Sequence, residues 1–313
     1  MTTRRAFLGL LGAGAFAPRT WAEARHAYDI AFAPVGDGVW MLEGAAEYFS
    51  KENGGAIVNI ALLQGETGII LVDTGPSVRY GEAIDLAIRQ IDPRGVSAVF
   101  NTHYHPDHLF GNQTFASKPI YSLEPTVSII DRDGDALADN MYRMLGDWMR
   151  GTDVVRPNRL VQGGEALIDG RRLSVLELGG HTAADLALVD STTGTLIAGD
   201  IAFLDRAPTT PDADLPRWHA ALDTLEGLNA SQIIPGHGPL DPSGASIRQT
   251  RDYLFWLEDT LRGAVLQGLD IIEAMEISLP PEYAEMDVQP GEFRRSVTHL
   301  FPKFEREELP RAN

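Results

Sequence analysis

Residues 101–108 constrain this chain more than any other stretch of its sequence. From His103 to His108 the order is His-Tyr-His-Pro-Asp-His, which supplies three imidazoles and one carboxylate. Imidazole suits zinc and other first-row metals, and carboxylate adds a harder oxygen donor. Packing alone does not explain four such groups in so short a segment. Without a cation between them they would repel one another, or their burial would cost free energy with nothing to offset it. The segment therefore predicts a metal site.

The flanking residues predict that this segment is a loop at the end of a buried strand. Val96–Phe100 is apolar and β-branched, which favours a strand, and residues 106–115 favour a short helix beginning at Pro106 and weakened by Gly111. Loops that follow such strands are where α/β proteins place ligand-binding groups.

The spacing divides the four donors into two pairs. His103 and His105 stand two apart on extended backbone, so their side chains can point the same way. Asp107 and His108 lie beyond the turn and should point elsewhere. One loop would then serve two metals.

Three more donors follow along the chain, each after an apolar run and a glycine: His181, Asp200 and His237. Glycine permits the backbone turn that aims a donor over a sheet edge. Asp200 has two oxygens and could bridge two metals. Three histidines lack such motifs and are interpreted as surface or helix-cap residues: His26, His219 and His299.

Five motifs in this order resemble the metallo-β-lactamase-fold hydrolases. Besides the His103–His108 motif they are Leu-Val-Asp-Thr-Gly (71–75), Gly-Gly-His-Thr-Ala-Ala-Asp (179–185), Ala-Gly-Asp (198–200) and Pro-Gly-His-Gly (235–238). The resemblance implies an α/β fold, the αββα sandwich of two mixed β-sheets flanked by helices. It also implies two zinc ions, the first held by His103, His105 and His181, and the second by Asp107, His108 and His237. Asp200 would bridge them, and Asp73 would lie beneath the site and orient a ligand histidine.

The resemblance is closer to some branches of this family than to others. True β-lactamases mostly lack the bridging aspartate and carry Cys or Ser near that place, whereas this chain has Asp200 and no cysteine. In having this aspartate, the chain is similar to the glyoxalase-II-like and lactonase-like hydrolases. The exported N-terminus and residues 101–112 resemble most the exported quinoprotein relay system zinc metallohydrolases, including SoxH-like proteins. This implies a functional link to a periplasmic quinoprotein dehydrogenase.

The first residues predict export. Arg4 and Arg5 precede Phe7-Leu8 and a mild apolar stretch, with small residues near Ala22 or Ala24 for cleavage. Residues 1–24 are therefore interpreted as a twin-arginine signal peptide, and the mature protein as periplasmic. The apolar stretch is shorter than the ~20 residues that a membrane span needs, so no stable membrane anchor is expected.

The remaining chain is divided into a hydrolase domain, residues 25–280, and a C-terminal tail, residues 281–313, which ends in a charged, frayed segment from residue 301. Residues 131–135 (Asp-Arg-Asp-Gly-Asp) are interpreted as a solvated break in a helix rather than a calcium loop. A formal charge of −18 argues against a nucleic-acid partner, because phosphates would be repelled.

These observations favour a hydrolase of small-molecule substrates. Two close zinc ions can share a hydroxide that attacks an ester-like bond of a thioester, lactone, β-lactam-like amide or sulfate ester, while Asp107 steers the hydroxide proton. Iron or manganese would fit the same ligands. Two alternatives remain, an iron-dependent persulfide dioxygenase and a metal-binding accessory protein for quinoprotein maturation.

Five aromatic residues could border the site but are each expected to serve packing: Tyr104, Tyr142, Trp148, Phe203 and Trp218.

Overall fold

The computed structural model describes residues 27–309. The expected signal peptide, residues 1–24, and His26 lie outside the described residues. Between residues 27 and 309, no helix combines the length and apolar character needed to cross a bilayer.

The first half of the described chain builds a seven-stranded mixed sheet in sequence order. Pairing is antiparallel from β1 to β4 and parallel from β4 to β7. Its strands are β1 (Ala33–Gly36), β2 (Val39–Leu42), β3 (Ile60–Gln64), β4 (Ile69–Val72), β5 (Val96–Phe100), β6 (Ile120–Ser122) and β7 (Arg159–Leu160). The expected strand Val96–Phe100 is confirmed as β5.

A five-stranded mixed sheet follows, in the order β12-β11-β10-β9-β8. Strands β11 and β12 pair in parallel, and the other neighbouring strands of this sheet pair antiparallel. Its strands are β8 (Gly164–Ile168), β9 (Arg171–Leu178), β10 (Asp185–Asp190), β11 (Thr195–Phe203) and β12 (Gln232–His237).

The two sheets pack face to face over one hydrophobic core. Leu63 and Phe100 from the first sheet belong to the same buried cluster as Leu188, Ile197 and Ile234 from the second. The outer face of the first sheet is covered by α1 (Val78–Ile91). Its N-cap is Ser77, whose hydroxyl oxygen accepts a hydrogen bond from Tyr80 N at 3.2 Å. Apolar side chains at helical spacing on α1 pack against β3 and β4.

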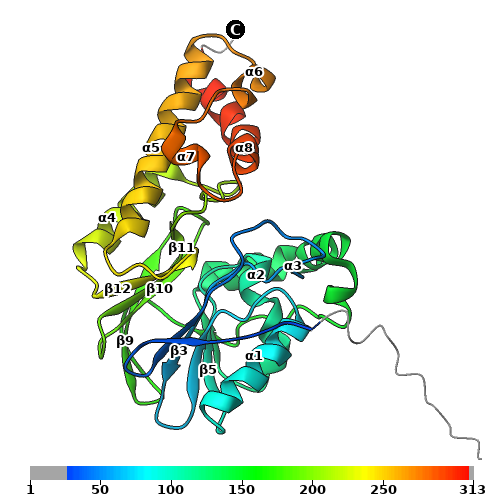
Figure 1. Cartoon of the computed structure of the whole chain (residues 1–313), viewed down its shortest axis with the longest axis vertical. Coiled ribbons are helices and arrows are strands. Elements are labelled where there is room, and N and C mark those ends of the chain that lie inside the picture. Colours follow the sequence, from blue (N-terminus) through cyan, green and yellow to red (C-terminus); the bar gives the residue numbers. More distant parts are fainter. Residues whose placement is uncertain (1–26, 310–313) are drawn as a thin grey trace, which may run out of the picture.

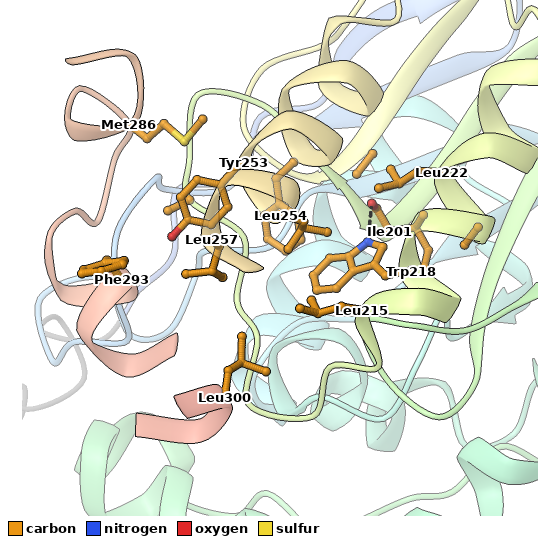
Figure 2. Packing of buried hydrophobic residues seen from close by; sticks show 14 of the residues in the cluster. Ile201, Leu215, Trp218, Leu222, Tyr253, Leu254, Leu257, Met286, Phe293 and Leu300 are labelled. Carbon is orange, nitrogen blue, oxygen red and sulfur yellow. Dashed lines mark hydrogen bonds between the residues drawn. The ribbon is translucent and has the colours of Figure 1, made fainter. Parts of the chain in front are cut away.

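Helices α4 (Leu215–Gly227) and α5 (Ala245–Leu266) cover the outer face of the second sheet. Trp218 of α4 is fully buried, and its indole N–H donates to Ile201 O of β11 at 2.9 Å. Figure 2 shows this bond beside Leu254 and Leu257 of α5. The layers therefore run helix, sheet, sheet, helix, and the expected αββα sandwich is confirmed.

The expected helix break at residues 131–135 is wrong. Helix α3 (Glu124–Leu145) continues through it and ends at the 3₁₀ turn η3 (Gly146–Met149). Gly134 is buried there, and a Cβ at this position would lie 2.9 Å from Val154 Cγ1. Gly134 thus allows α3 to pack closely against Val154, and this close packing outweighs the low helix propensity of glycine.

The expectation of a frayed segment from residue 301 is also wrong for the described residues. The chain forms α6 (Ile271–Met275), α7 (Pro281–Ala284) and α8 (Gly291–Glu308). Figure 1 shows these helices gathered along α5, away from β3 and β5. The apolar side of α8 joins the core cluster of α4 and α5, with Phe301 fully buried. Pro302 lies inside α8 without ending it.

Candidate metal centre

The seven predicted donors meet at the edge of the sandwich where both sheets end. His103 and His105 lie in the loop after β5, and Asp107 and His108 lie in the short helix α2 (Pro106–Leu109), which continues as the 3₁₀ helix η2 (Phe110–Phe115). The second sheet contributes the other three: His181 after β9, Asp200 within β11 and His237 at the end of β12.

The donors form two groups with ligand atoms within 4.8 Å of one another. One group contains His103, His105, His181 and Asp200, and the other contains Asp107, His108 and His237. All are buried except His105, which is half-buried. This is the same division that the spacing of the histidine loop predicted.

Asp200 lies between the two groups. Its Oδ2 is 3.3 Å from His181 Nε2 and 3.4 Å from His237 Nε2, and its Oδ1 is 3.3 Å from His108 Nε2. Oδ1 has no hydrogen-bond partner although it is buried, and the same is true of His103 Nε2 and His108 Nε2. Buried polar atoms without partners are rare, so their convergence on one point fits a bound cation.

Two of the imidazoles are held from behind by a buried carboxylate and a hydroxyl. Asp73 Oδ2 lies 2.7 Å from His108 Nδ1, and Thr102 Oγ1 lies 3.0 Å from His103 Nδ1. Asp73 also accepts from the Thr102 backbone N–H at 2.8 Å and from the Thr102 hydroxyl at 2.8 Å. These bonds fix the rings with Nε2 facing the centre, as ligand histidines require.

Backbone carbonyls hold two more rings. His181 Nδ1 lies 3.1 Å from Thr209 O, and His237 Nδ1 lies 2.7 Å from Ile57 O. Because a carbonyl only accepts, each Nδ1 carries the proton and each Nε2 keeps its lone pair for the centre. Sequence reasoning missed both partners, since any residue type offers a carbonyl.

Asp212 is a further residue that sequence reasoning missed. Its Oδ2 lies 3.2 Å from His105 Nε2, which leaves His105 Nδ1 facing His181 Nε2 at 3.0 Å. His105 therefore presents the opposite nitrogen from its neighbours. The hydrogen bond to His105 lowers the pKa of Asp212 to about 2, which keeps this carboxylate charged.

Glycines beside the donors make the close approach possible. A Cβ on Gly236 would lie 1.9 Å from Asp200 Oδ1, and one on Gly180 would lie 2.2 Å from the backbone of Trp218. Gly180 also has a φ of +132°, which favours glycine. The sequence pattern of strand, glycine and donor atom therefore has a steric cause.

The electrostatics favour neutral imidazoles on one side of the centre. Burial lowers the pKa of His181 to about 3 and the pKa of His103 well below its usual value. Both rings are thus deprotonated at neutral pH, which is the form that binds metal.

The other side attracts positive charge. Burial opposes protonation of His108, but the carboxylates of Asp200, Asp73 and Asp107 outweigh it and raise the pKa of His108 well above its usual value. Burial likewise opposes ionisation of Asp200, yet the surrounding imidazoles lower its pKa. A divalent cation bound there would balance the negative charges of these carboxylates in place of a proton on His108.

The other candidates stay outside the donor groups. Asp185 braces the His181 loop by accepting from the Thr182 N–H at 2.9 Å and the Thr182 hydroxyl at 2.8 Å. His219 stacks on Phe255 with ring centroids 3.9 Å apart. Four of the five aromatic residues pack in the core or near the donors: Trp148, Phe203, Trp218 and Tyr104. The fifth, Tyr142, is half exposed.

Known proteins resemble this chain in sequence. Residues 53–237 match the family model described as the metallo-beta-lactamase superfamily. A linear primary-alkylsulfatase from Pseudomonas sp. (strain ATCC 19151) is 24% identical over 76% of this chain and 53% of its own length. An acyl-coenzyme A thioesterase, MBLAC2, from Gallus gallus is 25% identical over 65% of this chain and 79% of its own length. The chain spans about half the length of the first two curated relatives it matches.

Solved structures agree on the fold. A metallo-beta-lactamase from Pontibacter korlensis superposes with a TM-score of 0.59 at 20% identity, over 72% of this chain and 99% of that one. The metallo-beta-lactamase IND-7 gives a TM-score of 0.58 at 20% identity, over 72% and 98%. The family model covers more than half of the chain, and this chain therefore belongs to the metallo-beta-lactamase superfamily.

Proposed function

We propose that the protein is a hydrolase of small ester-like substrates that works with two zinc ions. The observation that carries this proposal is the place of Asp200, whose two oxygens lie 3.3–3.4 Å from histidines of both donor groups. A shared carboxylate at that position supports two metals side by side, because each oxygen can serve one of them.

The donors fit zinc. Five imidazoles, whose outer nitrogens are held by hydrogen bonds, and two carboxylates match its preference for nitrogen and oxygen ligands. Zinc held here would supply Lewis acidity and lower the pKa of a water molecule toward ~7. Iron and manganese accept the same ligand types.

Asp107 is positioned to handle the proton that hydrolysis releases. Its Oδ2 lies 3.5 Å from His237 Nε2 and 3.7 Å from His108 Nε2, and the residue is 5% exposed. Addition of water across an ester frees one proton, which a carboxylate at this place accepts and passes to the leaving group. The imidazoles cannot take this role while their inner nitrogens bind metal.

The ester class of substrate is supported by the relatives. One is named for a sulfate ester and the other for a thioester of coenzyme A, and both matches include most of this chain. We therefore place thioesters, sulfate esters and lactones ahead of other bonds. The iron dioxygenase is less well supported, because the complete second group of Asp107, His108 and His237 favours two metals. The accessory-protein alternative is less well supported because both relatives are named for an enzymatic activity.

A periplasmic setting and a link to a quinoprotein dehydrogenase belong to the same proposal. They are supported by the Arg4-Arg5 leader and by residues 101–112. Fractionation of cells that express a tagged full-length chain tests the location, with Arg4→Lys and Arg5→Lys together as the control that should retain the protein inside the cell.

The activity is tested by metal analysis joined to a substrate panel. Purified protein should turn over a thioester, sulfate ester or lactone, lose this activity after chelation, and regain it with zinc. Asp107→Asn should lower turnover, while Asp139→Asn, on the exposed face of α3, should not. Equal turnover before and after thorough chelation would contradict the proposal, and one iron per chain with oxygen uptake on a persulfide would favour the dioxygenase.

A further inference from the structure

Two asparagine side chains meet at the base of the histidine loop. Asn101 follows β5 and Asn112 lies in η2, and both are fully buried. Their amides face each other, because Asn112 Nδ2 donates to Asn101 Oδ1 at 2.8 Å and Asn101 Nδ2 donates to Asn112 Oδ1 at 3.1 Å. The segment that carries Asp107 and His108 lies between these two residues, so the amide pair closes the loop at its base.

The backbone of His108 is held at the same place. Its carbonyl oxygen accepts from Thr74 N at 2.8 Å and from Asn101 Nδ2 at 3.2 Å. Thr74 directly follows Asp73, whose carboxylate meets His108 Nδ1 at 2.7 Å. Two adjacent residues after β4 therefore hold His108 at its carbonyl and at its ring.

Both polar atoms of the Asn112 side chain have partners, and these lie on three segments of the chain. Besides the bonds to Asn101, Oδ1 accepts from the Thr74 hydroxyl at 3.0 Å and Nδ2 donates to Val155 O at 3.0 Å. A Cβ on Gly111 would lie 2.0 Å from Thr74 O, so η2 is packed closely against the residues after β4. Loss of the amide would leave buried groups unpaired on these segments and free η2 to shift.

The amide pair supports one donor group more than the other. Asp107 and His108 lie on α2, which has four residues and is too short to fix its own position. His181 and Asp200 of the first group come from the second sheet, and the ring of His103 is held by a neighbouring hydroxyl. A shift of η2 would therefore displace donors of the second group before those of the first.

We propose that Asn112 is a positioning residue for the second metal, the one held by Asp107, His108 and His237. By fixing η2 against Thr74, it keeps α2 where both of its donors face the centre. Loss of the Asn112 side chain lowers the occupancy of this metal before that of the first and favours a form with one metal. This inference rests on the proposed two-metal centre.

Stepwise zinc binding tests the inference without an activity assay. Metal-depleted wild type and Asn112→Ala are titrated with zinc against a chromophoric chelator. We expect the dissociation constant of one site to rise about 10- to 100-fold, the size of effect seen when a group that orients a ligand is lost, and that of the other site to change by under about threefold.

Anomalous diffraction from crystals of Asn112→Ala, loaded at limiting zinc, identifies the site that empties. The zinc peak among Asp107, His108 and His237 should weaken relative to the peak on the side of His103 and His181. A general loss of stability would not produce this difference between the two positions.

Two variants serve as controls. Asn158→Ala removes an exposed asparagine that also bonds to backbone groups near β6, and it should bind both metals as wild type does. Ile88→Ala empties a fully buried position on α1, and it should lower the unfolding temperature without changing the ratio of the two zinc affinities.

A milder variant covers the case in which Asn112→Ala does not fold. Thr74→Val removes the hydroxyl that donates to Asn112 Oδ1 and keeps the shape of the side chain. Because the backbone N–H of Thr74 still holds His108 O, we expect the same selective weakening of the second metal, to a smaller degree.

Three results would overturn the inference. The first is binding of both metals by Asn112→Ala as tightly as by wild type, and the second is equal weakening of both. The third is the same selective loss in Ile88→Ala, which would show a general effect of stability. A wild-type protein that binds one metal or none would instead overturn the two-metal proposal itself.

Discussion

Each imidazole of the centre has its outer nitrogen held, but the partners differ in strength. His108 meets the buried carboxylate of Asp73 at 2.7 Å, whereas His181 and His237 meet neutral carbonyls. His105 meets Asp212, whose side chain is about half exposed. A buried charged partner orients a ring more firmly than a solvated one. We therefore expect that losing Asp73 weakens metal binding more than losing Asp212.

Asp73→Asn should weaken zinc binding about 10- to 100-fold, because an amide NH₂ would face His108 Nδ1–H in place of an acceptor. Asp73 has a φ of +63°, and asparagine tolerates this region, so the backbone should be preserved. Chelator competition measures the affinity, and circular dichroism checks the fold. Affinity equal to wild type would show that Asp73 does not orient His108.

Asp212→Ala should weaken zinc binding less, by about tenfold or under, because water can replace its exposed carboxylate at His105 Nε2. Asp139→Ala, at an exposed acid on α3 outside the donor groups, is the matched control and should bind zinc as wild type does. An Asp212→Ala effect larger than that of Asp73→Asn would reverse the proposed order.

The donors and one of their supports, Asp73, were predictable from the sequence, but the other supports were not. His103, Asp200 and their fellow donors belong to short motifs, and the structure brings all seven together. Thr209 acts through its carbonyl, and Asp212 lies in a loop with no recognisable pattern. Such partners depend on the path of the chain between distant elements, which periodicity does not reveal.

At the level of elements, the regular periodic segments were predicted and the exceptions were decided by tertiary packing. The strand expected at Val96–Phe100 is β5 with the same bounds. The frayed segment expected from residue 301 is wrong, because apolar residues at helical spacing accompany the charged residues there. Phe293, Val297, Leu300, Phe301 and Phe304 form that stripe on α8.

Phe301→Ala should destabilise the protein by about 3–5 kcal/mol, because it empties a fully buried position between α8 and the core. Lys303→Ala, two residues along and only half-buried, should change the free energy of unfolding by under about 0.5 kcal/mol. Denaturant unfolding followed by circular dichroism measures both. Equal stability of the two variants would mean that α8 is not docked.

Gly236→Ala should abolish binding of at least one metal, because its Cβ would lie 1.9 Å from Asp200 Oδ1 and displace the shared carboxylate. Gly227→Ala, at the end of α4 where a Cβ meets nothing within 4 Å, is the control. Metal content after dialysis distinguishes them. Two metals retained in Gly236→Ala would contradict the role given to this glycine.

For the whole molecule, the centre is a point where both sheets, the loop of residues 204–214 and the C-terminal helices meet. The layered sandwich was expected from the resemblance that the five sequence motifs carry. The contact of α8 with the loop of residues 204–214 was not expected, because it depends on the buried hydroxyls of Thr210 and Ser296, which are polar and resemble surface positions.

Removal of metal should lower the stability of the whole fold, since donors from both sheets lose their common partner. Zinc at about a thousand times its dissociation constant should add ~4 kcal/mol to the free energy of unfolding. Calorimetry of zinc-loaded and chelated protein measures the difference. The same unfolding temperature in both would show that no metal bridges the sheets.

The most direct test of the centre is X-ray diffraction from zinc-loaded crystals at the zinc absorption edge. Two anomalous peaks should appear ~3.5–4 Å apart, the usual spacing of paired catalytic metals. One should lie among His103, His105 and His181, the other among Asp107, His108 and His237, with Asp200 between them. A single peak, or peaks away from these residues, would contradict the account.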